Sequence, residues 1–151
     1  MSRKPAFSPD GRWIAYTSNE SGRTEVYVRP FPGGASSGSG KWQISTGGGR
    51  YPIWSRNGRE LFYENPDSRI MVVTYTAKAD SFAAGKPSSW SNTEILQPRA
   101  GDAWNLALAP DGKRFAVFPR PEATGQQKGS VHVTVLLNFF DELRRRVPTG
   151  K

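Results

Sequence analysis

One stretch of this sequence occurs three times, first as Pro5-Ala-Phe-Ser-Pro-Asp-Gly-Arg-Trp-Ile-Ala-Tyr16. The second copy reads Pro52-Ile-Trp-Ser-Arg-Asn-Gly-Arg-Glu-Leu-Phe-Tyr63, and the third reads Leu106-Ala-Leu-Ala-Pro-Asp-Gly-Lys-Arg-Phe-Ala-Val117. The acidic or amide position before the glycine falls at Asp10, Asn57 and Asp111, which are 47 and then 54 residues apart. A period of this length indicates supersecondary units that pack against one another along the chain.

Each copy has the residues of a tight hairpin turn. Pro9 and Pro110 preset φ at the first corner, Asp or Asn can bond its own backbone at the next position, and Gly takes the left-handed residue. Short apolar runs of β-forming residues flank each turn. The sequence therefore predicts an all-β fold, a partial β-propeller of about three four-stranded antiparallel blades, the last of them incomplete.

The apolar alternation predicts the remaining strands and the blade boundaries. We expect strands at 12–18, 25–30 and 41–46 in blade 1 (about 1–47), at 60–64, 70–76 and 92–96 in blade 2 (about 48–98), and at 106–109, 114–118 and 131–137 in blade 3 (about 99–138). Residues 139–151 suit a short C-terminal helix, because Asn138 can cap it and Pro148 would stop it. A frayed tail is the alternative. The chain, 1–151, is predicted to form a single domain.

Composition supports short strands and restricts the chemistry. The 151 residues include 16 Gly, 12 Pro and 12% aromatic side chains, which suits many strands joined by tight turns. There is no cysteine, so disulfides, thiol catalysis and Cys-based zinc sites are excluded. The first residues lack the apolar core of a signal peptide, and no apolar run approaches the roughly 18 residues of a membrane span. We expect a cytoplasmic location for the sequence as written, or a periplasmic one if it belongs to a longer parent chain.

The formal net charge of +8 permits an anionic partner. The basic residues are scattered over turns, and their one dense run is Arg144-Arg145-Arg146. This distribution favours a solvated basic surface over a nucleic-acid site. Nucleic-acid binding stays as the alternative, and it would weaken steeply with added salt.

The Ser8-Pro-Asp-Gly-Arg-x-Ile-Ala-Tyr16 hairpin resembles the TolB-like and WD-repeat-like β-propellers of bacteria. The segments Trp54–Tyr63, Ala109–Phe115 and Val133–Leu143 are similar to the C-terminal blades of propellers fused to bacterial serine/threonine protein kinases. The resemblance implies a binding or assembly module. Family propellers usually have six or more blades, against about three here. The kinase motifs and the Gly-His and Trp-Asp pairs of true WD repeats are missing.

The candidate catalytic motifs are weak. Gly34-Ala-Ser36-Ser-Gly38 fits the Gly-x-Ser-x-Gly pattern, but it lies in a Gly/Ser loop instead of the strand-to-helix turn that a hydrolase nucleophile needs. His132, the one histidine, alternates with valines on a predicted strand, and no triad partner is identified. We therefore predict no catalytic residue, no metal site, no cofactor and no enzymatic activity.

The predicted binding site is a ring around a central channel. Residues just before the innermost strand of each blade surround that channel, where ligands tend to bind. Arginine and aromatic side chains there suit peptides or acidic groups. Ordinary loop residues are the alternative. By alignment of the repeats the ring consists of Arg3, Lys4, Arg50, Tyr51, Trp104 and Asn105.

These features together predict a non-catalytic protein-interaction module with a protein or peptide partner. An incomplete propeller leaves unpaired strand edges at both ends, which invites pairing with another chain. We therefore expect a homo-oligomer, specifically a homodimer that closes about six blades. A third possibility is an accessory domain of a hydrolase or peptidase, without an active site of its own.

Overall fold

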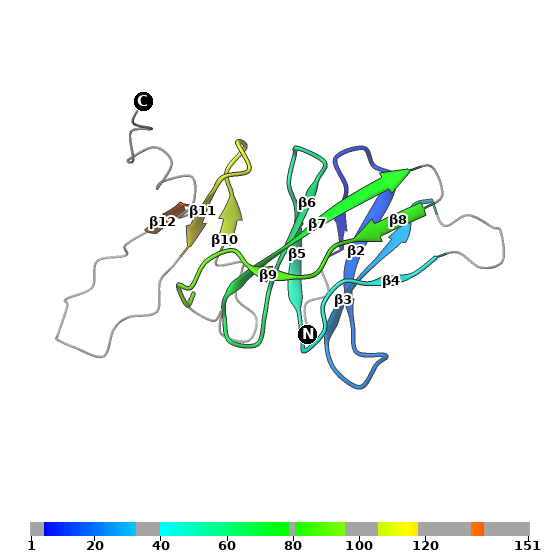
Figure 1. Cartoon of the computed structure of the whole chain (residues 1–151), viewed down its shortest axis with the longest axis horizontal. Coiled ribbons are helices and arrows are strands. Elements are labelled where there is room, and N and C mark those ends of the chain that lie inside the picture. The colour runs from blue at the N-terminus through cyan, green and yellow to red at the C-terminus, as the bar shows by residue number, and fades with distance from the viewer. Residues whose placement is uncertain (1–4, 33–39, 79–80, 96–105, 118–133, 138–151) are drawn as a thin grey trace, which may run out of the picture.

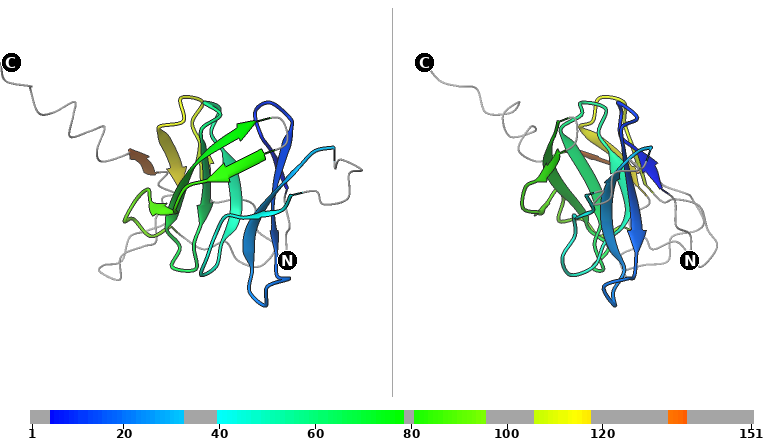
Figure 2. Two further views of the ribbon diagram at one scale, coloured as in Figure 1. Left: turned by 45° about the vertical axis from the view of Figure 1, so that its right-hand side comes forward. Right: turned by 90° about the vertical axis from the view of Figure 1, so that its right-hand side faces the viewer.

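The computed structural model describes residues 5–32, 40–78, 81–95 and 106–117, and the backbone of 134–137. Within these ranges all regular structure is β-strand, arranged in three antiparallel sheets. Figure 1 shows the sheets side by side in chain order, from blue on the right through green to yellow. The view turned by 90° in Figure 2 shows them one behind another. The predicted all-β partial propeller is confirmed in this part of the chain.

Every sheet is built from strands that follow one another in sequence. Sheet 1 has the order β1-β2-β3-β4, with β1 Ala6–Phe7, β2 Trp13–Ser18, β3 Glu25–Pro30 and β4 Trp42–Gln43. Sheet 2 has the order β5-β6-β7-β8 with β9 beside β7, and its strands are β5 Arg50–Trp54, β6 Glu60–Glu64, β7 Ile70–Lys78, β8 Ser81–Ala84 and β9 Ser88–Ser89. Sheet 3 contains β10 Leu106–Leu108, β11 Arg114–Val117 and β12 Thr134–Leu137. This up-and-down connection is that of a propeller blade.

The three repeated turns have one geometry. In each, the glycine N–H bonds the carbonyl three residues earlier, at 2.9 to 3.2 Å. The preceding Asp or Asn side chain accepts the N–H two residues after it, at 2.9 to 3.1 Å. The predicted left-handed glycine is confirmed in all three turns, with φ of 69° at Gly11, 68° at Gly58 and 68° at Gly112.

Sheet 2 lies between the other two sheets and is buried on both faces. Its strand β6 contains four consecutive residues, Leu61 to Glu64, that are at most 4% exposed. Successive side chains of a strand point to opposite faces. Leu61 and Tyr63 therefore enter a core shared with sheet 1, while Phe62 enters a core shared with sheet 3.

The core between sheets 1 and 2 is rich in aromatic rings. The ring of Phe82 on β8 lies 5.2 Å from that of Trp13 and 5.8 Å from that of Trp42. The Trp54 indole N–H donates to the Ala6 carbonyl at 2.8 Å, so its polar atom stays satisfied although the ring is buried. The buried members of this core are Trp13, Ala15, Val26, Val28, Ile44, Trp54, Leu61, Tyr63, Val73 and Phe82.

The core between sheets 2 and 3 centres on three aromatic rings. Phe62, Trp90 and Phe115 meet edge to face, with centroids 4.9 to 6.3 Å apart. Edge-to-face contacts of this kind stabilise a core beyond the burial of their area. The remaining buried members are Ile70, Ile95, Leu106 and Val117.

The outer part of sheet 2 differs from the prediction. The strand expected at 92–96 is wrong in its described part, because residues 92–94 form no strand and Ile95 forms a single bridge, while β8 and β9 pair with β7 and give this sheet five strands in place of four. Ile95 is nevertheless 1% exposed and donates its N–H to the Ser68 carbonyl at 2.9 Å. An apolar residue that packs into the core without forming a strand explains the error.

Several predicted features lie outside the described residues. These are the C-terminal helix at 139–151, the Gly-x-Ser-x-Gly segment at 34–38 and His132. In the ranges that are described, no helix of the length and apolarity needed to cross a membrane is found.

The turn glycines allow a matched test of the fold. Gly58 and Gly112 share a φ of 68°, but a Cβ on Gly58 would meet nothing within 4 Å, whereas one on Gly112 would lie 2.7 Å from the Ser55 hydroxyl of sheet 2. We expect Gly58→Ala to lower the free energy of unfolding by about 1 kcal/mol through backbone strain alone. Gly112→Ala should cost more, as measured by urea denaturation.

A substitution at Ser55 tests whether the larger loss of stability in Gly112→Ala comes from the contact with that hydroxyl. The Ser55 hydroxyl has no hydrogen-bond partner in the described structure, so Ser55→Ala alone should change the stability little. When Ser55→Ala is combined with Gly112→Ala, the double variant should lose only as much free energy of unfolding as Gly58→Ala does. Equal losses for the two single glycine variants would contradict the packing of the third turn against sheet 2.

Candidate functional site

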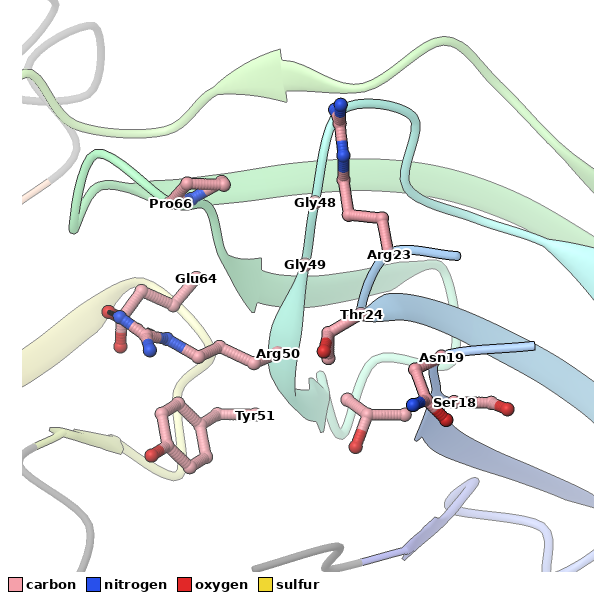
Figure 3. Close-up of a pocket in the computed structure, with 11 residues that line it drawn as sticks. Ser18, Asn19, Arg23, Thr24, Gly48, Gly49, Arg50, Tyr51, Glu64 and Pro66 are labelled. Carbon is pink, nitrogen blue, oxygen red and sulfur yellow. Dashed lines mark hydrogen bonds and ion pairs between the residues drawn. The ribbon is translucent and has the colours of Figure 1, made fainter. Parts of the chain in front are cut away.

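A cavity of about 350 Å³ opens at the junction of sheets 1 and 2. It lies where the hairpin between β2 and β3 meets the start of β5 and the end of β6 (Figure 3). Its volume is at the lower end of the range found for ligand pockets. The lining residues are Thr17, Ser18, Asn19, Arg23, Thr24, Gly48, Gly49, Arg50, Tyr51, Glu64 and Pro66.

The connection from sheet 1 to sheet 2 is anchored by a buried carboxylate. Glu25, which is 4% exposed at the start of β3, accepts the N–H groups of Gly47 and Gly48 at 3.1 and 2.9 Å. It also accepts the hydroxyl of Ser45, and that hydroxyl in turn accepts the Val26 N–H at 2.8 Å. This network directs the chain from the edge of sheet 1 into the first strand of sheet 2.

Glycine is required in this connection because other elements approach it closely. Gly47 and Gly48 have φ of 110° and 106°, in a region that side chains disfavour. A Cβ on Gly48 would lie 2.5 Å from the Pro66 ring, and one on Gly49 would lie 2.6 Å from the Ser45 hydroxyl. The glycines therefore let the loop pass close to the end of β6, and this places Arg50 at the cavity.

A β-bulge sets the partner of Arg50. The β5–β6 register pairs Arg50 with Glu64 and then Ile53 with Phe62, so two residues on β5 face one on β6. Tyr51, one of the two, has a φ of 55°, which is uncommon for a residue with a side chain. Pro52 follows it and has no N–H to lose from the ladder. The bulge therefore places Arg50 opposite Glu64 and turns Tyr51 toward the cavity.

Arg50 and Glu64 form an ion pair at the back of the cavity. The Arg50 Nη2 lies 2.9 Å from Oε1 of Glu64, and Nε lies 3.3 Å from the same oxygen. The Glu64 side chain is 2% exposed while that of Arg50 is 35% exposed. The buried carboxylate therefore fixes the position of the guanidinium, and the partly exposed Arg50 side chain lines the cavity. The guanidinium also lies 5.6 Å from the centre of the Tyr51 ring.

The opposite wall supplies hydroxyl and amide groups from sheet 1. Figure 3 shows Ser18, Asn19 and Thr24 on one side of the start of β5, and Arg50, Tyr51 and Glu64 on the other. Arg23 stands exposed at the rim, and in the described part of the chain its guanidinium has no ion-pair partner. Two guanidinium groups against one carboxylate favour an anionic ligand.

Two of the six predicted ring residues, Arg50 and Tyr51, line this cavity. The other four, Arg3, Lys4, Trp104 and Asn105, lie outside the described residues. The structure therefore brings one predicted pair to a cavity and leaves the ring itself a prediction.

Glu64 and the β2–β3 hairpin were not identified from the sequence as parts of a binding site. Glu64 follows an apolar run at the end of its strand, and a charged residue in that place is a signal for a buried partner. A regular ladder counted outward from the Asn57-Gly58 turn, however, would place Tyr51 opposite Glu64. The bulge moves the pairing by one residue, so the sequence does not indicate the Arg50–Glu64 pair.

Elsewhere in the described residues, no group of three or more acidic or histidine side chains is placed to hold a metal ion.

No family model and no curated protein matches the sequence. Among solved structures, TolB from Acinetobacter baumannii is similar, with a TM-score of 0.45 and 16% identity over 89% of this chain. The chain spans 43% of the length of that TolB. At this level of similarity no residue role or activity is transferred.

The buried ion pair predicts a stability difference between two charge deletions. Glu64→Gln should lower the free energy of unfolding by about 1–2 kcal/mol, because the Arg50 guanidinium loses the anion that holds it but remains partly solvated. Glu20→Gln breaks a bridge to Lys41 of similar length, 2.7 Å, in which both side chains are more than 40% exposed. In the same urea titration, this control should change the free energy of unfolding by too little to measure. A comparable loss in both variants would mean that the burial of Glu64 contributes nothing.

Proposed function

We propose that this chain is a non-catalytic protein-interaction module that holds an acidic group of a polypeptide partner at the junction of sheets 1 and 2. The observation that carries the proposal is the position of Arg50, whose side chain lines the cavity while its guanidinium is paired with the buried Glu64. A guanidinium held in a fixed orientation suits the two oxygens of a carboxylate, and less side-chain entropy is lost on binding.

The other lining groups support an acidic side chain or a terminal carboxylate as the ligand. The exposed Arg23 adds a second positive charge at the rim, and Ser18, Asn19 and Thr24 add neutral hydrogen-bond donors. The Tyr51 ring and Pro66 provide apolar surface for the rest of a peptide. Because the cavity measures about 350 Å³, it suits one or two side chains of a short segment and not a folded domain.

The proposal predicts charge-selective peptide binding that depends on Arg23. An acetylated hexapeptide of alternating glycine and aspartate should bind in isothermal titration calorimetry at low salt, whereas the matched glycine–lysine peptide should not. Arg23→Ala should weaken the affinity for the aspartate peptide about tenfold, the effect of losing one charge-assisted hydrogen bond.

Arg56→Ala is the matched control, because Arg56 is also exposed but lies on the second turn, away from the cavity lining. It removes the same charge and should leave the affinity unchanged. An equal loss in both variants would indicate attraction by overall charge and would contradict a site at the junction.

Self-association is the second part of the proposal, and a specific observation favours it. Phe7 and Phe31 are 53% and 46% exposed, and their rings meet edge to face at 4.8 Å on the side of sheet 1 that faces away from sheet 2. A pair of exposed aromatic rings on one sheet face is typical of a surface that a partner covers.

Self-association predicts a mass that rises with protein concentration. In sedimentation velocity the chain should change from monomer to dimer between about 1 and 200 µM, the range of moderate protein affinities. Since apolar contacts would drive the association, moderate salt should not abolish it. A single monomeric species at every concentration would end this part of the proposal and leave the peptide site unaffected.

A further inference from the structure

We infer that the free face of sheet 1 packs against sheet 3 of a second copy, head to tail, in the way that successive sheets pack within one chain. This inference rests on the proposed self-association and adds to it a surface, a register and a direction. It also changes the physical basis of that association. Successive sheets contact each other through their faces, so sheet 1 presents a face that no other described sheet covers, in contrast to the unpaired strand edges that the sequence suggested.

The free face of sheet 1 repeats the faces that are buried in sheets 2 and 3. In sheet 2 the residues that pack toward sheet 1 are Trp54, Leu61 and Tyr63, and in sheet 3 those that pack toward sheet 2 are Leu108, Phe115 and Val117. In the aligned repeats the equivalent positions of sheet 1 are Phe7, Ile14 and Tyr16. Sheet 1 therefore carries residues of the same kind on a face that no other described sheet covers, although Ile14 itself is only 9% exposed and the open part is Phe7 with Phe31.

The exposed pair Phe7–Phe31 has an equivalent pair in sheet 2 that packs in the core. Trp54 and Tyr75 hold the equivalent positions in sheet 2, and their rings meet at 4.9 Å and 81°, against 4.8 Å and 80° for the exposed pair. The backbone agrees, since the N–H groups of Phe31 and Tyr75 bond to carbonyls of equivalent arginines at 2.7 and 2.9 Å. Trp54 is nevertheless 7% exposed where Phe7 is 53% exposed. Trp54 packs in the core shared with sheet 1, and Phe82 of its own sheet adds to that cover.

Sheet 3 repeats part of the surface with which sheet 1 covers sheet 2. In sheet 1 the registered pair Ala15 and Val28 lies in the core against sheet 2. The same register in sheet 3 pairs Ala116 with Val135. Because Phe115 and Val117 face sheet 2, Ala116 faces away from it. In the aligned repeats the outer face of sheet 3 therefore has Ala107 and Ala116 at the places of Ala6 and Ala15, and Arg114 at the place of Trp13.

The charges on the free face of sheet 1 favour a head-to-tail contact over a symmetric one. Arg29 replaces the buried Val73 of sheet 2, and its guanidinium lies 5.4 Å from the Tyr16 ring. Lys41, which lies 5.1 Å from the Tyr27 ring, is already paired with Glu20 at 2.7 Å. Two such faces packed against each other would oppose like charges. A head-to-tail contact instead sets Arg29 against the outer face of sheet 3, where Arg114 is paired with Asp111 at 2.8 Å. It gives a closed assembly if the rotation between copies completes a ring.

The register identifies two residues that should meet. Within the chain, the Trp54 indole contacts the Ala6 carbonyl. Their equivalents across the proposed contact are Phe7 of one copy and the exposed Ala107 of the other. As the chain has no cysteine, Phe7→Cys and Ala107→Cys can be prepared separately, mixed and treated with a short bis-maleimide. The mixture should give a mixed cross-linked dimer, and neither variant alone should do so.

Thr76→Cys mixed with Ala107→Cys is the control, because Thr76 is exposed on β7, outside the proposed contact. It should give no cross-linked dimer. Efficient cross-linking of Phe7→Cys alone would overturn the head-to-tail direction in favour of a symmetric contact. Association without a mixed cross-link would overturn the interface while leaving self-association intact, and a monomer throughout would end both.

Substitutions on the free face give an independent measurement. Phe31→Asp should raise the dimer dissociation constant about tenfold or more, because a charge would enter the aromatic contact. Arg29→Val should lower it, since it restores the apolar residue of the buried equivalent. Thr76→Asp adds the same charge elsewhere and should have no effect, and circular dichroism establishes that each variant is folded. An unchanged constant for both Phe31→Asp and Arg29→Val would overturn the proposed interface.

Discussion

A strand such as β6, with four consecutive residues buried, is stable only while another sheet covers each of its two faces. Sheets 1 and 3 supply that cover through two separate aromatic cores, and the rest of the structure follows from this arrangement. Each end sheet buries one face against sheet 2. On the other face of sheet 1, Phe7 and Phe31 stay in contact with solvent although their equivalents in sheet 2 are covered. Stacking by faces therefore accounts for both the cohesion of the molecule and its exposed aromatic surface.

The same stacking creates the candidate site. The chain must pass from the edge of sheet 1 to the first strand of sheet 2 within a few residues, which requires the left-handed glycines and their anchor, Glu25. The strand that begins there carries Arg50, and the bulge after it brings Glu64 opposite. The cavity is thus a product of how neighbouring sheets are connected, and its polar groups come from the connection and the adjoining hairpin ends more than from the cores.

The features that could be predicted from the sequence are those set by local chemistry. A proline, an Asp or Asn and a glycine determine the backbone of each turn, so the three hairpins and the strands beside them follow from those residues. The partners of β7 could not be predicted in this way. Phe82 forms a strand because its ring packs against Trp13, nearly seventy residues earlier, and Ile95 is buried without forming one. The Arg50–Glu64 pair depends on a one-residue register shift at Tyr51, which no periodicity indicates.

The division into two cores also affects how the molecule can come apart. With nearest-neighbour coupling between stacked units, opening of an end unit breaks one interface and leaves the other intact. Release of sheet 3 would expose Phe62 and Trp90 but would leave the aromatic core of sheets 1 and 2 in place. Every residue that lines the cavity belongs to those two sheets or to the loops that join their strands. The groups of the proposed binding site therefore belong to a cooperative unit that can persist while the third sheet opens, so binding at this cavity would be separable from partial unfolding in this fold.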